Sequence, residues 1–170
     1  MGKYQEPHYD VIEKDGAFEL RRYAPFVSVA TPDNTLRGSG FGRLFSFISG
    51  RNQSKEKMPM TIPVLNDTES STMEFVLPLH MVKKSDAPMP MDDQEEIKEY
   101  QLNLTAAVRF SGKSSVEKIN MQIQMLEAWC EKKGYRPTKA PLIARYNAPM
   151  TPGFLRRNEI ILQIEDTNEK

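Results

Sequence analysis

Few residues in this chain have the types and spacing that catalysis or metal binding requires. Its 170 residues include two histidines, His8 and His80, and one cysteine, Cys130. A single cysteine excludes an internal disulfide and a zinc site built from cysteines, and we expect Cys130 to be an inert, buried thiol. The glycines at 38, 40 and 42 are spaced too closely for a dinucleotide-binding loop, and neither a phosphate-binding loop nor a serine elbow is present.

Aromatic and aliphatic side chains are concentrated on one short predicted helix. Four apolar residues recur at i, i+3, i+4 and i+7, which places them on one helix face: Phe41, Leu44, Phe45 and Ile48. We expect this face to pack in the core. Phe47 lies off it, so its ring is left to a cleft or to solvent. Gly50 stands where a left-handed C-cap is expected.

Basic and thioether side chains surround this helix. The basic residues are Arg37, Arg43, Arg51, Lys55 and Lys57. Guanidinium groups pair with carboxylates in a two-pronged geometry, although a charge run is also ordinary solvated surface. Met58 and Met60 follow, and methionine suits either a pocket wall or a core gap. This stretch therefore offers apolar surface with a cationic rim.

The elements that hold these residues form an antiparallel pattern. Apolar and polar residues alternate on both sides of Asp15-Gly16, a dipeptide that tolerates the positive φ of a tight turn, so a hairpin is expected there. Further strands are predicted at 26–31, 60–65, 73–77, 102–110, 142–146 and 159–164.

A second helix is predicted to begin after Ser114, which forms a capping box with Glu117. Trp129 on this helix is expected to pack rather than to stack on nucleic acid, and Gly134 is expected to end the helix. The inner face is predicted to comprise Val116, Ile119, Ile123, Leu126 and Cys130.

Two halves, 7–82 and 95–165, share the order strand, helix, strand, strand, with residues 85–95 as a connector. We expect a single domain over 1–170 with its core at 7–165, because this length suits one domain. The halves are expected to pair their sheets about a pseudo-two-fold axis. The class is α+β, and a cleft between a helix and the sheet edge is the expected place for a ligand.

The charge balance limits the classes of partner. There are 23 basic and 23 acidic residues, so nucleic acid is not expected as a partner. No apolar run approaches the roughly 20 residues that span a bilayer, and no signal peptide is visible. We therefore expect a cytoplasmic protein with no membrane partner, and a monomer rather than an oligomer.

Five segments together carry a resemblance to a known family. They are PHYDVIEKDGAFELRRYAPF at 7–26, GSGFGRLFSFISGRNQSKEKMPMTIPVL at 38–65, MEFVLP at 73–78, VRFSG at 108–112 and ARYNAPMTPGFLRRNEI at 144–160. In this order they resemble the SOUL haem-binding family over nearly the whole chain. The resemblance implies a distorted antiparallel β-barrel-like sheet of about eight strands with two helices, an architecture related to GyrI-like effector-binding domains.

The resemblance also implies a function and a site. Haem or another porphyrin is expected in a surface cleft between the first helix and the loop before the last strand, for buffering, transport or sensing. Such a ligand needs a flat apolar slot, cations for its propionates and, optionally, an iron ligand. The residues expected to bind haem are Arg37, Phe41, Arg43, Leu44, Phe47, Met58, Met60, Tyr146, Met150 and Phe154.

Iron ligation by the protein is the least defined part of this hypothesis. His80 is the metal-ligand prediction, with Met150 and Tyr146 as further choices, and binding through the rim and propionates alone is also open. The Arg156–Glu159 run is expected to anchor its hairpin by pairing with an internal carboxylate.

Two alternatives to haem binding remain open. One is a GyrI-like sensor or hydrolase for a small hydrophobic compound, which needs an acid or base in its cleft; Glu74, Tyr146 and Glu159 are the available residues. The other is an adaptor that docks through the Met- and Pro-rich connector at 85–95. The expectation is a binding protein without enzymatic activity.

Overall fold

The computed structural model describes residues 4–33, 39–147 and 151–168. The chain divides into two compact units. Unit 1 consists of Met1–Pro7 and Pro25–Gln101, and unit 2 consists of His8–Ala24 and Leu102–Lys170.

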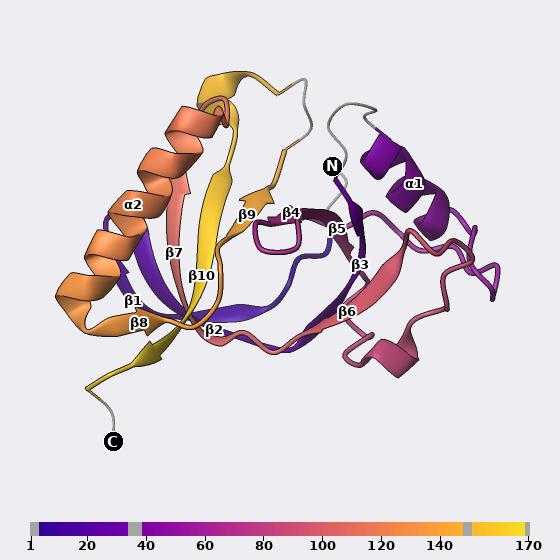
Figure 1. Cartoon of the computed structure of the whole chain (residues 1–170), viewed down its shortest axis with the longest axis horizontal. Helices are drawn as coiled ribbons and strands as arrows, with labels where there is room; N and C mark the ends of the chain where they lie inside the picture. The colour runs from indigo at the N-terminus through magenta and orange to yellow at the C-terminus, as the bar shows by residue number, and fades with distance from the viewer. Residues whose placement is uncertain (1–3, 34–38, 148–150, 169–170) are drawn as a thin grey trace. The chain divides into compact units, whose positions relative to one another are not determined.

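Unit 1 is a four-stranded antiparallel sheet with one helix (Figure 1). Its strands run in the order β4-β5-β3-β6. The elements are β3 (Phe26–Pro32), α1 (Ser39–Ile48), β4 (Val64–Asp67), β5 (Thr72–Val76), the short 3₁₀ helix η1 (Lys84–Asp86) and β6 (Glu96–Tyr100). β3 is buried along almost its whole length because it is flanked by β5 and β6 and covered by α1.

α1 ends in the predicted left-handed cap. The Arg51 N–H donates to the Ser46 carbonyl at 3.0 Å, and the Gly50 N–H donates to the Phe47 carbonyl at 3.2 Å. Gly50 has a φ of 114°, a conformation that side chains with a Cβ rarely adopt. The prediction for Gly50 is confirmed, and the chain turns sharply into the loop that follows α1.

Unit 2 is a six-stranded sheet with the longer helix. The strand order is β1-β2-β7-β10-β9, and β8 pairs with the end of β10. The elements are β1 (Tyr9–Asp15), β2 (Phe18–Tyr23), β7 (Asn103–Phe110), α2 (Val116–Lys133), β8 (Tyr135–Pro137), β9 (Leu142–Arg145), the 3₁₀ turn η2 (Gly153–Leu155) and β10 (Asn158–Asp166). The predicted hairpin is confirmed: β1 and β2 pair from Tyr9 with Tyr23 to Asp15 with Phe18.

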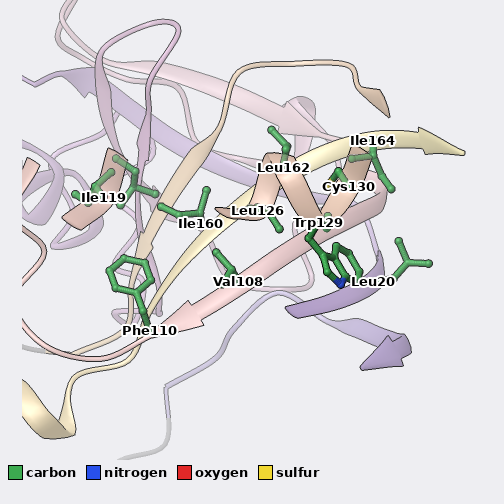
Figure 2. Packing of buried hydrophobic residues seen from close by; sticks show 12 residues of the cluster. Leu20, Val108, Phe110, Ile119, Leu126, Trp129, Cys130, Ile160, Leu162 and Ile164 are labelled. Atoms are coloured by element: carbon green, nitrogen blue, oxygen red, sulfur yellow. The ribbon is translucent and has the colours of Figure 1, made fainter. Parts of the chain in front are cut away.

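α2 packs its apolar face on β7 and β10 (Figure 2). Trp129 is a packing residue, as predicted: its ring stacks on Phe18 at 5.5 Å, and its Nε1–H donates to Asp15 at 3.0 Å. Burial raises the pKa of the Cys130 thiol to about 11, and nearby Glu127 adds to the shift, so the inert role predicted for this thiol is consistent with its surroundings.

The beginning of α2 differs from the prediction by one residue. Ser115, not Ser114, is the N-cap, and its side chain accepts from the Lys118 N–H. Val116 therefore stands at the first helical position and is 75% exposed, so its predicted place on the inner face is wrong. The predicted C-cap is confirmed, since Gly134 has a φ of 80° and its N–H donates to the Cys130 carbonyl.

The strands exchange between the two halves of the sequence. β2 leads into β3 but pairs with β7, and β6 leads into β7 but pairs with β3. Each unit has a strand, a helix and then further strands, as β3-α1-β4-β5 and as β7-α2-β8-β9-β10, so the predicted order recurs with β8 added. Unit 1 also contains β6 from the second half of the sequence, and unit 2 contains β1 and β2 from the first half.

The predicted α+β class, with an antiparallel sheet and two helices, is confirmed, and the structure defines two details of the sheet. The described residues form ten strands rather than about eight, because β6 and β8 were not predicted. In neither unit does the described strand order return to its first strand, so no closed barrel forms. Among the described residues, no helix has the length and apolarity to cross a membrane.

Candidate functional site

The buried face of α1 is not the predicted one. Leu44 and Phe47 have no exposed surface and Ile48 is 4% exposed, and all three belong to the unit 1 core. Phe41 and Phe45 are instead 46% and 50% exposed. The expectation that Phe47 faces a cleft is wrong, and Leu44 likewise has no surface to offer a ligand.

Phe41 and Phe45 form an aromatic surface on the outer flank of α1. Their ring centroids are 6.3 Å apart and the two planes differ by only 13°. Phe41 also meets the buried Phe75 ring edge-on, at 5.0 Å and 70°. The Phe75 contact anchors the pair, so two nearly parallel rings remain half exposed at a fixed position.

An open depression of about 410 Å³ lies beside Phe45. We call it the α1 groove; its lining residues are Phe45, Ile48, Ser49, Lys57, Met58 and Met60. Met58 is 8% exposed and Met60 is half-buried, whereas Lys57 is exposed. The groove thus has aromatic, thioether and aliphatic walls and one cation at its rim.

The loop that supplies Lys57 and Met58 is held by Asn52, which is fully buried. The Asn52 amide donates to the Phe47 and Glu56 carbonyls, both at 2.9 Å, and accepts from the Glu56 N–H at 3.0 Å. The Met58 N–H then donates to the Ile48 carbonyl at 2.7 Å. Because buried amides with full hydrogen bonding fix the backbone around them, the groove wall is preformed.

Arg43 makes its contacts away from this groove. Its guanidinium donates to the Thr31 hydroxyl at 2.8 Å and lies 3.5 Å from the Asp92 carboxylate. It lines a separate, more polar depression of about 500 Å³, together with Gly42, Ser46, Arg51, Asp92 and Glu95. Burial raises the pKa of Glu95, and the neighbouring Asp92 raises it further. The structure therefore gives Arg43 a role in tying α1 to β3 and to the segment before β6.

Among the described residues, the other predicted site residues do not line the α1 groove. Tyr146 and Phe154 belong to unit 2, where Tyr146 is buried and Phe154 is 79% exposed. His80 is an exposed residue of unit 1. Arg37 and Met150 lie outside the described residues.

The possible acid–base residues of unit 2 are held in a buried ion network. Both oxygens of Glu159 accept from the Arg21 guanidinium, at 2.8 and 2.7 Å, and Oε1 also accepts from the Tyr146 hydroxyl at 2.9 Å. Burial alone would raise the pKa of Glu159, but the hydrogen bonds and charge of Arg21 outweigh it and hold the pKa below its usual value. Arg157 also pairs with Glu159, at 3.2 Å, so this ion pair lies within the 156–159 run, and the Glu159–Arg21 pair links the run to β2.

Glu74 occupies an equivalent position in unit 1. It is fully buried, and it accepts from Ser28 at 2.8 Å, from Lys98 at 2.8 Å and from Tyr100 at 2.6 Å. Among the described residues no buried side-chain nitrogen or oxygen lacks a partner, and no group of three or more His, Cys, Asp or Glu could hold a metal. Glu74, Tyr146 and Glu159 thus serve as internal ion-pair and hydrogen-bond partners.

Four groove residues are absent from the predicted site, namely Phe45, Ile48, Ser49 and Lys57, and the sequence held a signal for two of them. Phe45 was assigned to the core, although its i, i+4 relation to Phe41 was visible in the sequence. Lys57 was counted only among the basic cluster, although it precedes Met58 directly. Two features of the sequence therefore indicated these residues: the i, i+4 spacing of Phe41 and Phe45, and the position of Lys57 directly before Met58.

Comparisons with known proteins agree with the resemblance. Residues 4–163 match the family model described as SOUL heme-binding protein. The curated relatives include heme-binding protein 2 of Homo sapiens, 29% identical over 92% of this chain and 82% of that protein. They also include heme-binding protein 1 of Xenopus laevis, 26% identical over 87% of this chain and 84% of that protein.

Solved structures show the same fold at low sequence identity. A hydrolase from Listeria innocua superposes with a TM-score of 0.60 at 10% identity, covering 91% of this chain and 94% of that one. The C-terminal domain of EcmrR gives a TM-score of 0.59 at 15% identity, covering 93% and 98%. At such identities the likeness concerns the fold alone. The curated sequence relatives carry haem-binding names.

Proposed function

Because the chain belongs to the SOUL haem-binding protein family, we propose that it binds haem on the outer flank of α1, over Phe41, Phe45 and the α1 groove. One observation carries this location: two nearly parallel rings, 46% and 50% exposed, stand beside a groove walled by methionine. Half-exposed aromatic surface of this kind on a rigid helix is unfavourable in water and favourable against a flat apolar ligand.

The residues of this flank fit a porphyrin in composition. Phe41 and Phe45 would contact the macrocycle, and Met60 would pack against its edge, since thioethers make favourable contacts with aromatic surfaces. Lys57 would pair with a propionate as an exposed point charge. When bound, haem would supply an iron–porphyrin group with a characteristic visible absorption.

Lys57 replaces Arg43 as our choice for the propionate partner. Arg43 already pairs with Thr31 and Asp92, so turning it toward a ligand would break both contacts. The Lys57 side chain makes no ion pair in the described part of the chain and stands at the groove rim.

The remaining features of the predicted cleft stay predictions. In the sequence, Tyr146, Met150 and Phe154 lie between β9 and β10. Their part in haem binding rests on the family resemblance. His80 stays the predicted iron ligand, and a rim-only mode of binding stays open beside it. We further propose a cytoplasmic monomer that buffers, carries or senses haem.

A titration of the apo-protein with ferric haem, followed by the Soret absorption, tests the location. Phe41→Ser, Phe45→Ser and Lys57→Glu each change an exposed or half-exposed side chain, so the fold should persist. We expect a saturable one-to-one shift in the wild type and affinities reduced about five- to tenfold in each variant, an effect of roughly 1–1.4 kcal/mol. Tyr4→Ser removes another aromatic ring, 56% exposed and outside the groove, and is the matched control.

Two results would change the proposal. The absence of a saturable shift in the wild type would overturn haem binding itself. Unchanged affinity in all three groove variants, together with loss in Phe154→Ser or His80→Ala, would move the haem to the other predicted residues.

A further inference from the structure

Three large apolar side chains stand exposed at one end of unit 2. Phe154 is 79% exposed, Leu155 is 61% exposed and Val116 is 75% exposed. Phe154 and Leu155 belong to η2, and Val116 begins α2. We call these three residues the apolar tip. Figure 1 shows η2, in yellow, beside the first turn of α2, in agreement with the hydrogen bond that the Gly112 N–H donates to the Gly153 carbonyl at 2.8 Å.

The apolar tip stands on a backbone that is held by hydrogen bonds. Within η2, the Leu155 N–H donates to the Pro152 carbonyl at 2.9 Å and the Arg156 N–H to the Gly153 carbonyl at 3.1 Å. The Arg156 Nε donates to the Thr151 carbonyl at 2.8 Å. Phe154 and Leu155 therefore lie on a turn whose backbone is fixed by hydrogen bonds, and their side chains remain exposed to solvent. Large apolar side chains that stand exposed together on neighbouring segments can mark an interaction surface.

Positive charge surrounds the apolar tip. Lys113 is exposed and adjoins the Gly112 that bonds to η2, and Lys118 lies on the first turn of α2. The Lys118 ammonium donates to the Ser111 carbonyl, which holds it at this end of the helix. Arg156 of the adjoining segment is a third basic residue, while the first turn of α2 has one acid, Glu117, in a chain whose net charge is zero. Basic residues therefore outnumber acidic ones among these positions, whereas the two are equal in number over the whole chain.

We propose that the apolar tip is a docking point on the surface of a membrane that contains anionic lipids. Phe154 and Leu155 would enter the interfacial layer, and Lys113 and Lys118 would face lipid phosphates. Reversible membrane attachment commonly combines a short apolar insertion with basic charge, because neither alone suffices. Three exposed side chains cover far less than the roughly 800 Å² per partner of a stable protein interface, which favours a lipid surface over a protein.

A surface contact of this kind does not need a spanning segment. The expectation that a membrane is not a partner rested on the lack of a long apolar run, which excludes crossing but not peripheral docking. The apolar tip also lies in unit 2, whereas the α1 groove lies in unit 1. Haem binding and membrane docking can therefore fail independently of one another.

Sedimentation of the full chain with lipid vesicles tests the proposal. One set is phosphatidylcholine alone, and the other contains about one third phosphatidylserine. We expect the wild type to bind the anionic vesicles and to lose affinity in high salt. The double variant Phe154→Ser with Leu155→Ser should bind at least about tenfold more weakly, and Lys113→Glu at least about fivefold more weakly on anionic vesicles.

The double variant Phe41→Ser with Phe45→Ser is the matched control, because it removes two exposed rings from the other unit and should keep vesicle binding. Haem titration of Lys113→Glu, which lies outside the predicted haem site, and thermal unfolding of both variants should match the wild type, which separates docking from haem binding and from misfolding. As an independent measurement, a tryptophan introduced by Phe154→Trp should shift its emission to shorter wavelength on anionic vesicles, above the constant signal of buried Trp129. Failure of the wild type to sediment with anionic vesicles, or equal binding to both vesicle types, would overturn the proposal.

Discussion

Glu159 has no exposed surface, yet it remains ionised because Arg21 satisfies both of its oxygens. Arg21 is itself only 2% exposed, so each charge is the main compensation for burying the other. Tyr146 and Arg157 complete the set, with the Arg157 guanidinium 3.7 Å above the Tyr146 ring. This arrangement makes four residues of the segments that carry the family resemblance structural partners within unit 2.

Removal of one partner should be strongly destabilising. Arg21→Met would leave Glu159 buried without its counter-ion, and we expect a loss of about 3–5 kcal/mol in the free energy of unfolding. Arg136→Met, which breaks an exposed ion pair with Glu165, is the control and should cost less than about 1 kcal/mol. Urea unfolding at neutral pH measures both. Similar small losses in the two variants would show that the buried pair contributes little.

The same pair predicts a pH dependence with a definite sign. The pKa of Glu159 in the folded chain lies below its ordinary value of 4.5, so the ionised form stabilises the fold at pH above 4.5. This contribution is lost as the pH falls through the folded pKa. The difference in unfolding free energy between the wild type and Glu159→Gln should therefore be constant at pH 6 to 7 and shrink below about pH 4.5. A gap that widened on acidification would contradict the assignment.

Phe45 and Phe47 show what sequence periodicity leaves undecided. Five of the eight residues from 41 to 48 are apolar, so two overlapping stripes satisfy a helical period. The folded chain buries the stripe of Leu44, Phe47 and Ile48 in the core of unit 1. Which of the two stripes turns inward depends on tertiary packing of α1 against β3 and β5, which the local period does not contain.

At the level of elements, β2 and β6, which each pair with a strand from the other half of the sequence, share a short motif of a cation and a tyrosine. β2 contains Arg21-x-Tyr23 and β6 contains Lys98-x-Tyr100, and each motif directs its cation at a buried glutamate in its unit. β6 has only one buried apolar residue, Ile97, so hydrophobic alternation did not reveal it. Local patterns predicted the hairpin, both helices and most strands. They could not predict that β2 pairs with β7 and β6 with β3, because these strands are far apart in the sequence.

The cap of α1 is predicted to affect binding, whereas the cap of α2 is not. Gly50 and Gly134 both end helices at positive φ, of 114° and 80°. Replacement of either by alanine should cost about 1 kcal/mol or more of stability. Gly50 also begins the loop that carries Lys57 and Met58 into the α1 groove, so Gly50→Ala should weaken haem binding several-fold. Gly134→Ala, the matched control, should leave haem affinity unchanged, and equal affinities in both variants would argue against a preformed groove.

At the scale of the whole molecule, sequence halves and structural units are different divisions. Residues 7–82 omit β6, and residues 95–165 omit the β1–β2 hairpin that pairs with β7. The stretch 25–101, in contrast, contains α1 and all four strands of unit 1, together with both partners that β6 gives to Glu74. A three- or four-stranded sheet with a covering helix is about the smallest arrangement that holds its own core.

A fragment of residues 25–101 should therefore fold, and the fragment 25–95, which lacks β6, should not. Circular dichroism and urea unfolding would show a cooperative transition in the first and none in the second. If haem lies on the outer flank of α1, the fragment 25–101 should also give the Soret shift of the full chain, with an affinity within about tenfold. A folded fragment without that shift would mean that residues of unit 2, such as Tyr146 or Phe154, are needed to hold the haem. That result would favour the cleft implied by the family resemblance over the α1 groove alone.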